Sequence, residues 1–267
     1  MMADTGLGGT LARSRSDLAT RAGAGAAMIA VALVALWLGG FAFWLLASVA
    51  ALLMLAEWGG LMRCDTGRIR ATLIVFAVPL LCACPLLVGP ERGVVMLLGG
   101  AALVVAVASG STRLGAGLLY AGLPAIGLIY LREQPQGIAL TLWTLAIVWA
   151  TDIGAYFSGR RFGGPRLAPI VSPNKTWSGL LGGMVAALLL GAGLAALFGL
   201  PGPLLFLGAP LAILAQMGDL FESWLKRRAG VKDSGRLLPG HGGALDRLDG
   251  VVPVAVLIAA LRSAGLI

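Results

Sequence analysis

The feature that most constrains this chain is the recurrence of apolar runs of 16 or more residues along most of its length. Glycine and proline are scattered inside these runs, as membrane helices tolerate. A soluble domain carries about 25% charged residues, whereas only 12% of this chain is charged. Because the bilayer core cannot satisfy backbone polar groups, and no period-2 alternation indicates a barrel, we predict an all-α integral membrane protein.

Nine segments are candidate transmembrane helices, so the predicted architecture is a polytopic bundle. The first two segments are separated only by Gly39 and Gly40, and eight helices remain an alternative count. The candidate spans are 23–39, 41–56, 71–89, 94–109, 114–131, 138–157, 177–199, 204–221 and 251–266.

Positive charges are distributed unevenly between the segments that connect these spans. With the N-terminus in the cytoplasm, all but three of the 20 Lys and Arg residues fall on the cytoplasmic side. The exceptions are Arg92, Arg132 and Arg262. This asymmetry is the positive-inside pattern, and it supports nine spans as well as the orientation. The net charge of +8 therefore reports topology first and does not indicate a nucleic-acid partner.

The chain divides into three regions by composition. Residues 1–22 form a cytoplasmic tail, 23–136 a transmembrane scaffold, and 137–267 a catalytic transmembrane region. The third region contains two cytoplasmic loops, 158–176 and 222–250, which are rich in Gly, Pro, Lys and Arg. We therefore expect the function in the C-terminal half, with the active site at the cytoplasmic face.

Two carboxylates interrupt apolar runs of the catalytic region. Asp152 lies inside the span 138–157, and Asp219 lies near the end of the span 204–221. A carboxylate in hydrocarbon is costly unless it faces a polar cavity, so both are candidate functional residues. For Asp219, a side chain that reaches the interface from the end of a helix is the simpler alternative.

The loop 222–250 combines a basic cluster, a glycine-rich stretch around His241 and two carboxylates three residues apart. Basic side chains bind phosphate oxygens, and flanking glycines let backbone N–H groups approach a phosphate closely. Paired carboxylates suit Mg²⁺ bound together with substrate phosphates. The combination indicates phosphoryl or nucleotidyl transfer, although each feature alone has a simpler structural explanation. The candidate residues are Ser223, Lys226, Arg227, Lys232, Asp233, Arg236, His241, Gly242, Gly243, Asp246, Arg247 and Asp249.

The loop 158–176 ends in Ser172, Lys175 and Thr176, immediately before the span 177–199. The free N–H groups at the start of a helix favour an anion, and Lys175 adds a full positive charge. Ser172 or Thr176 could instead cap the helix, and the sequence leaves both roles open.

The order of these residues resembles the signature of the phosphatidate cytidylyltransferases, also called CDP-diglyceride synthetases. The segments Gly218-Asp219-Leu220 and Ser172-Pro173-x-Lys175-Thr176 also resemble that family, as does Asp152 followed by Tyr156 and Gly159-Arg160. Ser178 departs from it, because many members carry Glu or Gln there. The matching pattern is Ser223-x-Leu225-Lys226-Arg227-x4-Lys232-Asp233-x-Gly235-x2-Leu238-Pro239-x-His241-Gly242-Gly243-x2-Asp246-Arg247-x-Asp249.

The resemblance implies that a phosphate oxygen of phosphatidic acid attacks the α-phosphorus of CTP, releasing pyrophosphate. It implies a bacterial inner-membrane enzyme that uses Mg²⁺, with K⁺ as a second cation, and we also expect a homodimer. Asp219, Asp246 and Asp249 would hold the metal, and Asp152 would hold a basic residue or water. The residues expected to neutralise phosphates or line the nucleotide pocket are Lys175, Lys226, Arg227, Lys232, Arg236, His241, Gly242 and Gly243.

Two other functions remain alternatives. A CTP- or ATP-dependent polyprenol kinase would use a similar basic loop, but it would transfer a terminal phosphoryl group. A transporter of anionic substrates is suggested by the acids at Asp152 and Asp219. A transporter predicts related halves and charges along a path through both leaflets. The sequence contains no such repeat that we detect, and its charges concentrate at one face.

Overall fold

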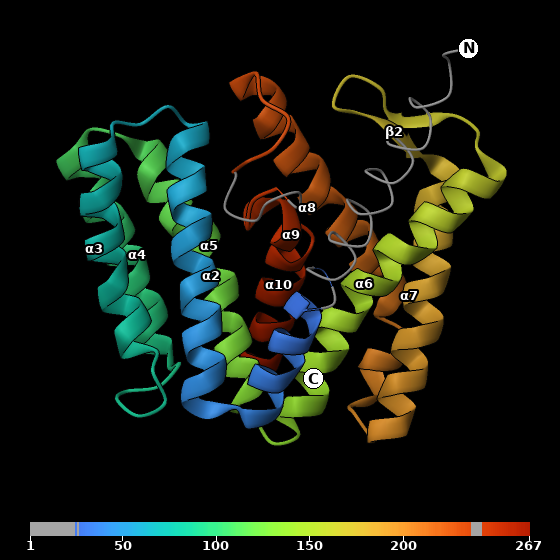
Figure 1. Ribbon diagram of the computed structural model, residues 1–267. Helices are drawn as coiled ribbons and strands as arrows, with labels where there is room; N and C mark the ends of the chain where they lie inside the picture. Colours follow the sequence, from blue (N-terminus) through green and yellow to red (C-terminus); the bar gives the residue numbers. More distant parts are fainter. Residues whose placement is uncertain (1–24, 26, 236–241) are drawn as a thin grey trace, which may run out of the picture.

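The computed structural model describes residue 25 and residues 27–235 and 242–267 (Figure 1). Most of these residues form helices that run side by side through one bundle. The helices are Ala27–Leu38, α2 (Gly40–Leu61), α3 (Thr66–Cys82), α4 (Arg92–Ser109), α5 (Thr112–Arg132), α6 (Gly137–Phe162), α7 (Trp177–Phe198), η1 (Gly202–Leu205), α8 (Gly208–Ala229), α9 (Leu245–Leu248) and α10 (Val251–Ser263).

Each of the nine predicted spans corresponds to a helix in the part of the chain that the structure describes. Five of these helices, α2 and α4 to α7, are long and apolar enough to cross a membrane. Helix Ala27–Leu38 and α10 are apolar but shorter, and α8 carries charged residues along its second half. The chain is therefore a helical membrane protein. The number of helices that cross the bilayer stays a prediction.

Both predicted cytoplasmic loops contain more regular structure than the sequence indicated. Helix α8 continues to Ala229, so the basic cluster lies on its last turns rather than in a loop. The other loop contains the end of α6 and an antiparallel hairpin of β1 (Arg166–Ala168) and β2 (Ser172–Thr176). The all-α prediction missed this hairpin, because pairing of such short strands leaves no trace in the pattern of apolar runs.

Buried apolar side chains form two large clusters that divide the bundle. The first is built mainly from α2 to α5, and the second from residues between Leu131 and Ile267. Three residues of the C-terminal half nevertheless belong to the first cluster: Leu225 on α8, Leu245 on α9 and Val252 on α10. The two halves are therefore joined where α8 and α9 meet the scaffold.

Helices α6 and α7 approach closely because small residues line their contact. A Cβ atom added to Gly183 would lie 2.8 Å from the Thr151 carbonyl oxygen. Small residues at four-residue spacing let two membrane helices pack with their backbones close together. The buried residues of α7 are Gly179, Gly183, Ala187, Gly191 and Ala195.

Two of the segments that carry sequence motifs share one end of the bundle (Figure 1). The hairpin and the C-terminal end of α8 lie at the top in this view, and the C-terminus of the chain lies at the opposite end. Helix α9 lies lower and packs between α2 and α8. After α8 the chain therefore turns back into the bundle, and this return brings the second half of the motif against the scaffold.

Candidate active site

The first of two charged clusters joins the β-hairpin to α8, and we call it the Lys175 cluster: Lys175, Asp219, Asp249 and Asp152. The Lys175 ammonium forms an ion pair with Asp219 Oδ2, and both side chains are partly exposed. Ser223, one turn further along α8, donates a hydrogen bond to Asp219 Oδ1 at 3.4 Å. Lys175 therefore has a protein partner at the position where the sequence predicted a substrate phosphate.

Asp249 and Asp152 add further negative charge to the Lys175 cluster. Asp249 follows α9 and accepts a hydrogen bond from the Gly250 amide at 2.7 Å. Burial, and then the charge of Asp219, raise the pKa of the Asp249 carboxyl above its usual range. Asp152 on α6 also interacts electrostatically with Asp219 and Lys175. Asp219 thus pairs with the Lys175 ammonium, and the carboxyls of Asp249 and Asp152 interact with that pair electrostatically.

Gly218 explains how α8 and the end of α9 come so close. A Cβ atom added to Gly218 would lie 2.3 Å from the Asp249 carbonyl oxygen, so a larger side chain would force the two segments apart. Packing therefore explains why a glycine precedes Asp219 in the sequence motif. The glycine allows the close approach, and the next residue places its carboxylate beside Asp249.

The second charged cluster lies about one turn further along the same face of α8, and we call it the Lys226 cluster: Lys226, Glu222, Asp246, Ser234 and Glu57. The Lys226 ammonium lies 2.6 Å from Glu222 Oε2 and 2.6 Å from Asp246 Oδ1. Asp246 Oδ2 accepts hydrogen bonds from the Ser234 amide at 3.0 Å and its hydroxyl at 2.8 Å. Both partners of Lys226 are carboxylates, so its charge is already neutralised within the protein.

Asp246 is held as an anion by these contacts. Burial alone would raise its pKa, but hydrogen bonding with Glu222 and Lys226, and with the backbone of Gly243 and Ser234, holds the pKa well below its usual range. The Gly243 amide donates to Asp246 Oδ2 at 2.8 Å. Since both carboxylate oxygens have protein donors, Asp246 serves as an acceptor that organises the surrounding segment.

Glu57 on α2 completes the Lys226 cluster, and the sequence reasoning missed it. Its Oε2 accepts from the Ser234 hydroxyl at 3.0 Å and the Leu245 amide at 2.9 Å, and its Oε1 accepts from the Ala244 amide at 2.9 Å. The predicted span ended at residue 56, whereas α2 continues to Leu61. Extending the apolar run to that point would have identified Glu57 as a buried carboxylate, by the criterion that identified Asp152 and Asp219.

The predicted metal ligands do not gather at one point. Among the described residues, no group of three or more His, Cys, Asp or Glu side chains could hold a metal ion. Asp219 and Asp249 belong to the Lys175 cluster and Asp246 to the Lys226 cluster. Asp246 lies in α9 and Asp249 has helical backbone angles, but Asp246 contacts Lys226 whereas Asp249 interacts with Asp219 and Lys175.

The remaining predicted site residues have separate surroundings. Thr176 caps α7, since its hydroxyl accepts a hydrogen bond from the Gly179 amide at 3.1 Å. Ser172 begins β2. Arg227 is exposed and its Nε donates to the Val171 carbonyl oxygen in the hairpin at 3.3 Å.

Residues between α8 and α9 complete the predicted set. Lys232 and Asp233 are exposed. Gly242 adopts a φ of 78°, a left-handed conformation that glycine reaches without strain. Arg247 lines an apolar cavity together with residues of α2, α5 and α6. Arg236 and His241 lie outside the described residues.

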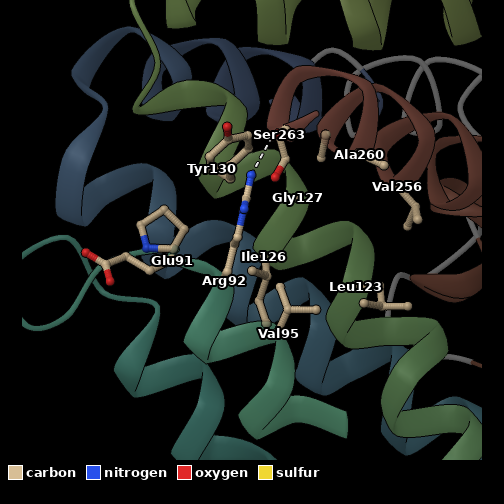
Figure 2. A pocket seen from close by; sticks show the side chains of 12 residues that line it. Glu91, Arg92, Val95, Leu123, Ile126, Gly127, Tyr130, Val256, Ala260 and Ser263 are labelled. Atoms are coloured by element: carbon tan, nitrogen blue, oxygen red, sulfur yellow. Dashed lines mark hydrogen bonds between the residues drawn. The ribbon is translucent and has the colours of Figure 1, made fainter. Parts of the chain in front are cut away.

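Two cavities in the bundle differ in their relation to the charged clusters. The pocket in Figure 2 has a volume of about 280 Å³, lies between α4, α5 and α10, and is lined by none of the predicted site residues. A larger cavity of about 590 Å³ includes Tyr120 and Phe221, whose ring centroids are 5.6 Å apart. Phe221 lies two residues after Asp219, so this apolar cavity adjoins the segment of α8 that carries the Lys175 cluster.

Comparison with known proteins decides the family. Residues 19–264 match the model of the cytidylyltransferase family. The chain belongs to this family. The phosphatidate cytidylyltransferase of Brucella suis biovar 1 (strain 1330) is 42% identical over 254 residues, which cover 91% of this chain and 92% of the relative. The protein of the same name from Pseudomonas aeruginosa is 42% identical over 168 residues, which cover 56% of this chain and 56% of the relative. The one from Haemophilus influenzae is 45% identical over 132 residues, which cover 45% of this chain and 44% of the relative.

In this cytidylyltransferase each cluster contains three carboxyl groups and one ammonium, but the carboxyls are bonded differently. In the Lys226 cluster, Lys226 pairs with Glu222 and Asp246, and the oxygens of Asp246 and Glu57 accept hydrogen bonds from the segment that follows α8. In the Lys175 cluster, Asp219 pairs with Lys175, and Asp152 and Asp249 interact with both electrostatically. The exposed Arg227 contacts the hairpin that carries Lys175.

Proposed function

We propose that this chain is a phosphatidate cytidylyltransferase, which joins CTP to phosphatidic acid and forms CDP-diacylglycerol and pyrophosphate. The observation that carries the proposal is the relative of that name, which is 42% identical across 91% of this chain. The motif residues around Asp219 and Asp246, and the family model that spans residues 19–264, agree with the same reaction.

The reaction requires two anionic substrates to meet. A phosphate oxygen of the lipid forms a bond to the α-phosphorus of CTP, and the bond between the α-phosphorus and the bridging oxygen breaks. That oxygen leaves with the electron pair as part of pyrophosphate. Positioning and charge neutralisation provide most of the catalysis in such transfers. Arg227 and Lys232 are exposed and can meet the triphosphate, and the apolar cavity next to Phe221 suits an acyl chain of the lipid.

We also propose that the enzyme depends on Mg²⁺, held by Asp219 and Asp249 rather than by Asp246. The carboxyls of Asp219 and Asp249 interact with each other electrostatically, and Mg²⁺ usually joins one or two carboxylates to substrate phosphates and water. When bound, Mg²⁺ would offset the negative charge of the triphosphate. K⁺ as a second cation and the homodimer stay predictions.

The active site is proposed to face the cytoplasm of a bacterial inner membrane. CTP is cytosolic and phosphatidic acid lies in the leaflet, so the two substrates meet at the interface. The positive-inside pattern assigns both motif-bearing segments to the cytoplasmic side, and these segments share one end of the bundle (Figure 1).

The proposed reaction is tested with purified protein, phosphatidic acid, Mg²⁺ and CTP labelled on either the α- or the γ-phosphate. We expect the α-label in the lipid product and the γ-label in pyrophosphate. Transfer of the γ-label to a lipid would overturn the proposal in favour of a lipid kinase. Failure to label any lipid, together with uptake of anions by vesicles that contain the protein, would favour the transporter. Addition of EDTA tests the metal proposal and should abolish turnover.

A further inference from the structure

We propose that Glu57, a residue of the scaffold half, is a positioning residue for CTP binding. Its carboxylate contacts Ser234, next to Gly235, and also Ala244 and Leu245, which follow Gly242 and Gly243. This inference rests on the proposed function, because the sequence assigns the last two glycines to the nucleotide pocket.

The hydrogen bonds of the Glu57 side chain within the described residues come from Ser234, Ala244 and Leu245. Two backbone amides donate to its carboxylate at 2.9 Å, and the Ser234 hydroxyl, whose one proton lies between Glu57 and Asp246, is 3.0 Å from it. Glu57 is only 6% exposed. A buried carboxylate that keeps its charge requires such donors, because desolvation is otherwise unfavourable by several kcal/mol. Here the charge on α2 is satisfied by residues that lie more than 170 positions away in the sequence.

Two glycines of the motif are explained by Glu57. A Cβ atom added to Gly235 would lie 2.5 Å from Glu57 Oε1, and the three nearest atoms all belong to Glu57. A Cβ atom added to Gly243 would lie 2.3 Å from Glu57 Oε2. The sequence suggested that Gly243 lets the backbone approach a phosphate. In the structure it leaves room for a carboxylate of the scaffold.

Ser234 links Glu57 to the rest of the Lys226 cluster. Its hydroxyl lies 3.0 Å from Glu57 Oε2 and 2.8 Å from Asp246 Oδ2. Asp246 in turn contacts Lys226 on α8. A continuous chain of polar contacts therefore connects α2 with α8 through the start of the nucleotide segment, and such networks rigidify a structure when every member has a partner.

Hydrophobic packing holds the same elements together independently of Glu57. Leu225 and Leu245 are 4% and 1% exposed and belong to the scaffold core. Removing the charge of Glu57 should therefore leave α8 and α9 attached to the scaffold. The effect should be confined to the geometry of the segment between them, which distinguishes a positioning role from a general role in folding.

The test compares Glu57→Gln with the wild-type protein in steady-state kinetics. The KM for CTP should rise at least tenfold, while kcat and the KM for phosphatidic acid change less than twofold. Asp65→Asn is the matched control, because Asp65 Oδ2 also accepts from two backbone amides, at 2.8 and 3.2 Å, but at the start of α3. This control should leave the KM for CTP unchanged.

A mutant cycle tests the same contact without relying on one variant. Gly235→Ala should raise the KM for CTP in the wild-type background. In the Glu57→Ala background it should add less than twofold, because the atoms that it would meet are gone. Equal effects of Gly235→Ala in both backgrounds would contradict the proposal.

Hydrogen exchange separates this proposal from the proposed function, since it needs no substrate. In Glu57→Gln, the amides of Ala244 and Leu245 should exchange at least tenfold faster, and those of Gly67 and Arg68 should not change. If the wild type forms no CDP-diacylglycerol, the proposed function fails, but this measurement still decides whether Glu57 holds the segment. Unchanged exchange at these amides, or a fall in kcat with no rise in the KM for CTP, overturns the proposal.

Discussion

The Lys175 cluster and the Lys226 cluster occupy the same stretch of α8 and each contain three carboxyls and one ammonium, but their carboxyls have different hydrogen-bond donors. Asp219 and Ser223 belong to the first, and Glu222 and Lys226, three residues further along, belong to the second. In the Lys226 cluster the oxygens of Asp246 and Glu57 accept hydrogen bonds from protein donors. In the Lys175 cluster three carboxylates interact with one ammonium group.

This difference teaches that similar charged residues on one helix can have separate tasks. Carboxylates such as Asp246 and Glu57, whose oxygens accept hydrogen bonds from backbone amides, fix the conformation of the chain around them. Neighbouring carboxyls such as Asp219 and Asp249 can instead bind a cation that accompanies the nucleotide phosphates. We therefore assign conformation mainly to the Lys226 cluster and chemistry mainly to the Lys175 cluster, and three predictions test that division.

The largest effect is expected from Asp219→Asn, which keeps the shape of the side chain and removes its charge. Loss of an electrostatic contact to the reacting groups lowers rates by about 100-fold or more. The thermal midpoint should stay near that of the wild type, because the Asp219 side chain is partly exposed and two further carboxyls remain close to Lys175. Activity and thermal unfolding of the purified variant check both statements. Near-normal turnover with unchanged Mg²⁺ dependence would remove Asp219 from the chemistry.

Asp246→Asn should act mainly on stability. Removing one partner of a buried, hydrogen-bonded charge pair destabilises a protein by about 3 kcal/mol or more. Because the folded pKa of Asp246 is depressed, this contribution is present at neutral pH. This stabilisation is lost as the pH falls from about 4, the usual pKa of an aspartate in the unfolded chain, toward the lower pKa of Asp246 in the folded protein.

Thermal unfolding of Asp246→Asn at neutral pH measures this loss, and its rate should fall less than that of Asp219→Asn. Asp233→Asn is the control for stability, since that exposed neighbour should leave the unfolding midpoint unchanged. An unaltered midpoint in Asp246→Asn, with complete loss of turnover, would move Asp246 to the chemistry and break the division.

The smallest effect is expected from Arg227→Ala, which tests the cations around the Lys175 cluster. Arg227 is exposed and points toward the hairpin, where it contacts the Val171 carbonyl oxygen. Its loss should raise the KM for CTP about tenfold, equivalent to about 1.4 kcal/mol. Arg228 lies over the Trp224 ring at 5.4 Å, so Arg228→Ala should change this KM less than twofold. Equal effects would mean that the two residues act only through general positive charge.

Much of the fold could be predicted from the sequence. The predicted spans correspond to helices, because the length of an apolar run is a local property. The small hairpin was not predicted, and the end of α8 was placed about two turns too early. At that end Glu222 and the basic residues interrupt the apolar pattern, although the helix continues there with partners from α9.

The candidate site was predicted less completely than the fold. The motif identified Asp219, Lys226 and Asp246, but it indicated neither which of them pair nor that Lys226 has two carboxylate partners. Thr176 proved to be a helix cap, one of the two roles that the sequence had left open. Glu57 was missed, because nothing in the order of residues connects it with Ser234 and Leu245.

The sequence by itself determined a membrane-embedded helical chain, the family of the protein and the set of residues that could meet two phosphate-bearing substrates. Only the tertiary structure decided how those charges are divided between the Lys175 and Lys226 clusters. Hydropathy and motif spacing are read along the chain, whereas a charge is neutralised by whatever packing brings within about 4 Å of it. The charged residues are divided between the two clusters by the close approach of α8 to the end of α9 at Gly218 and of α2 to Gly235.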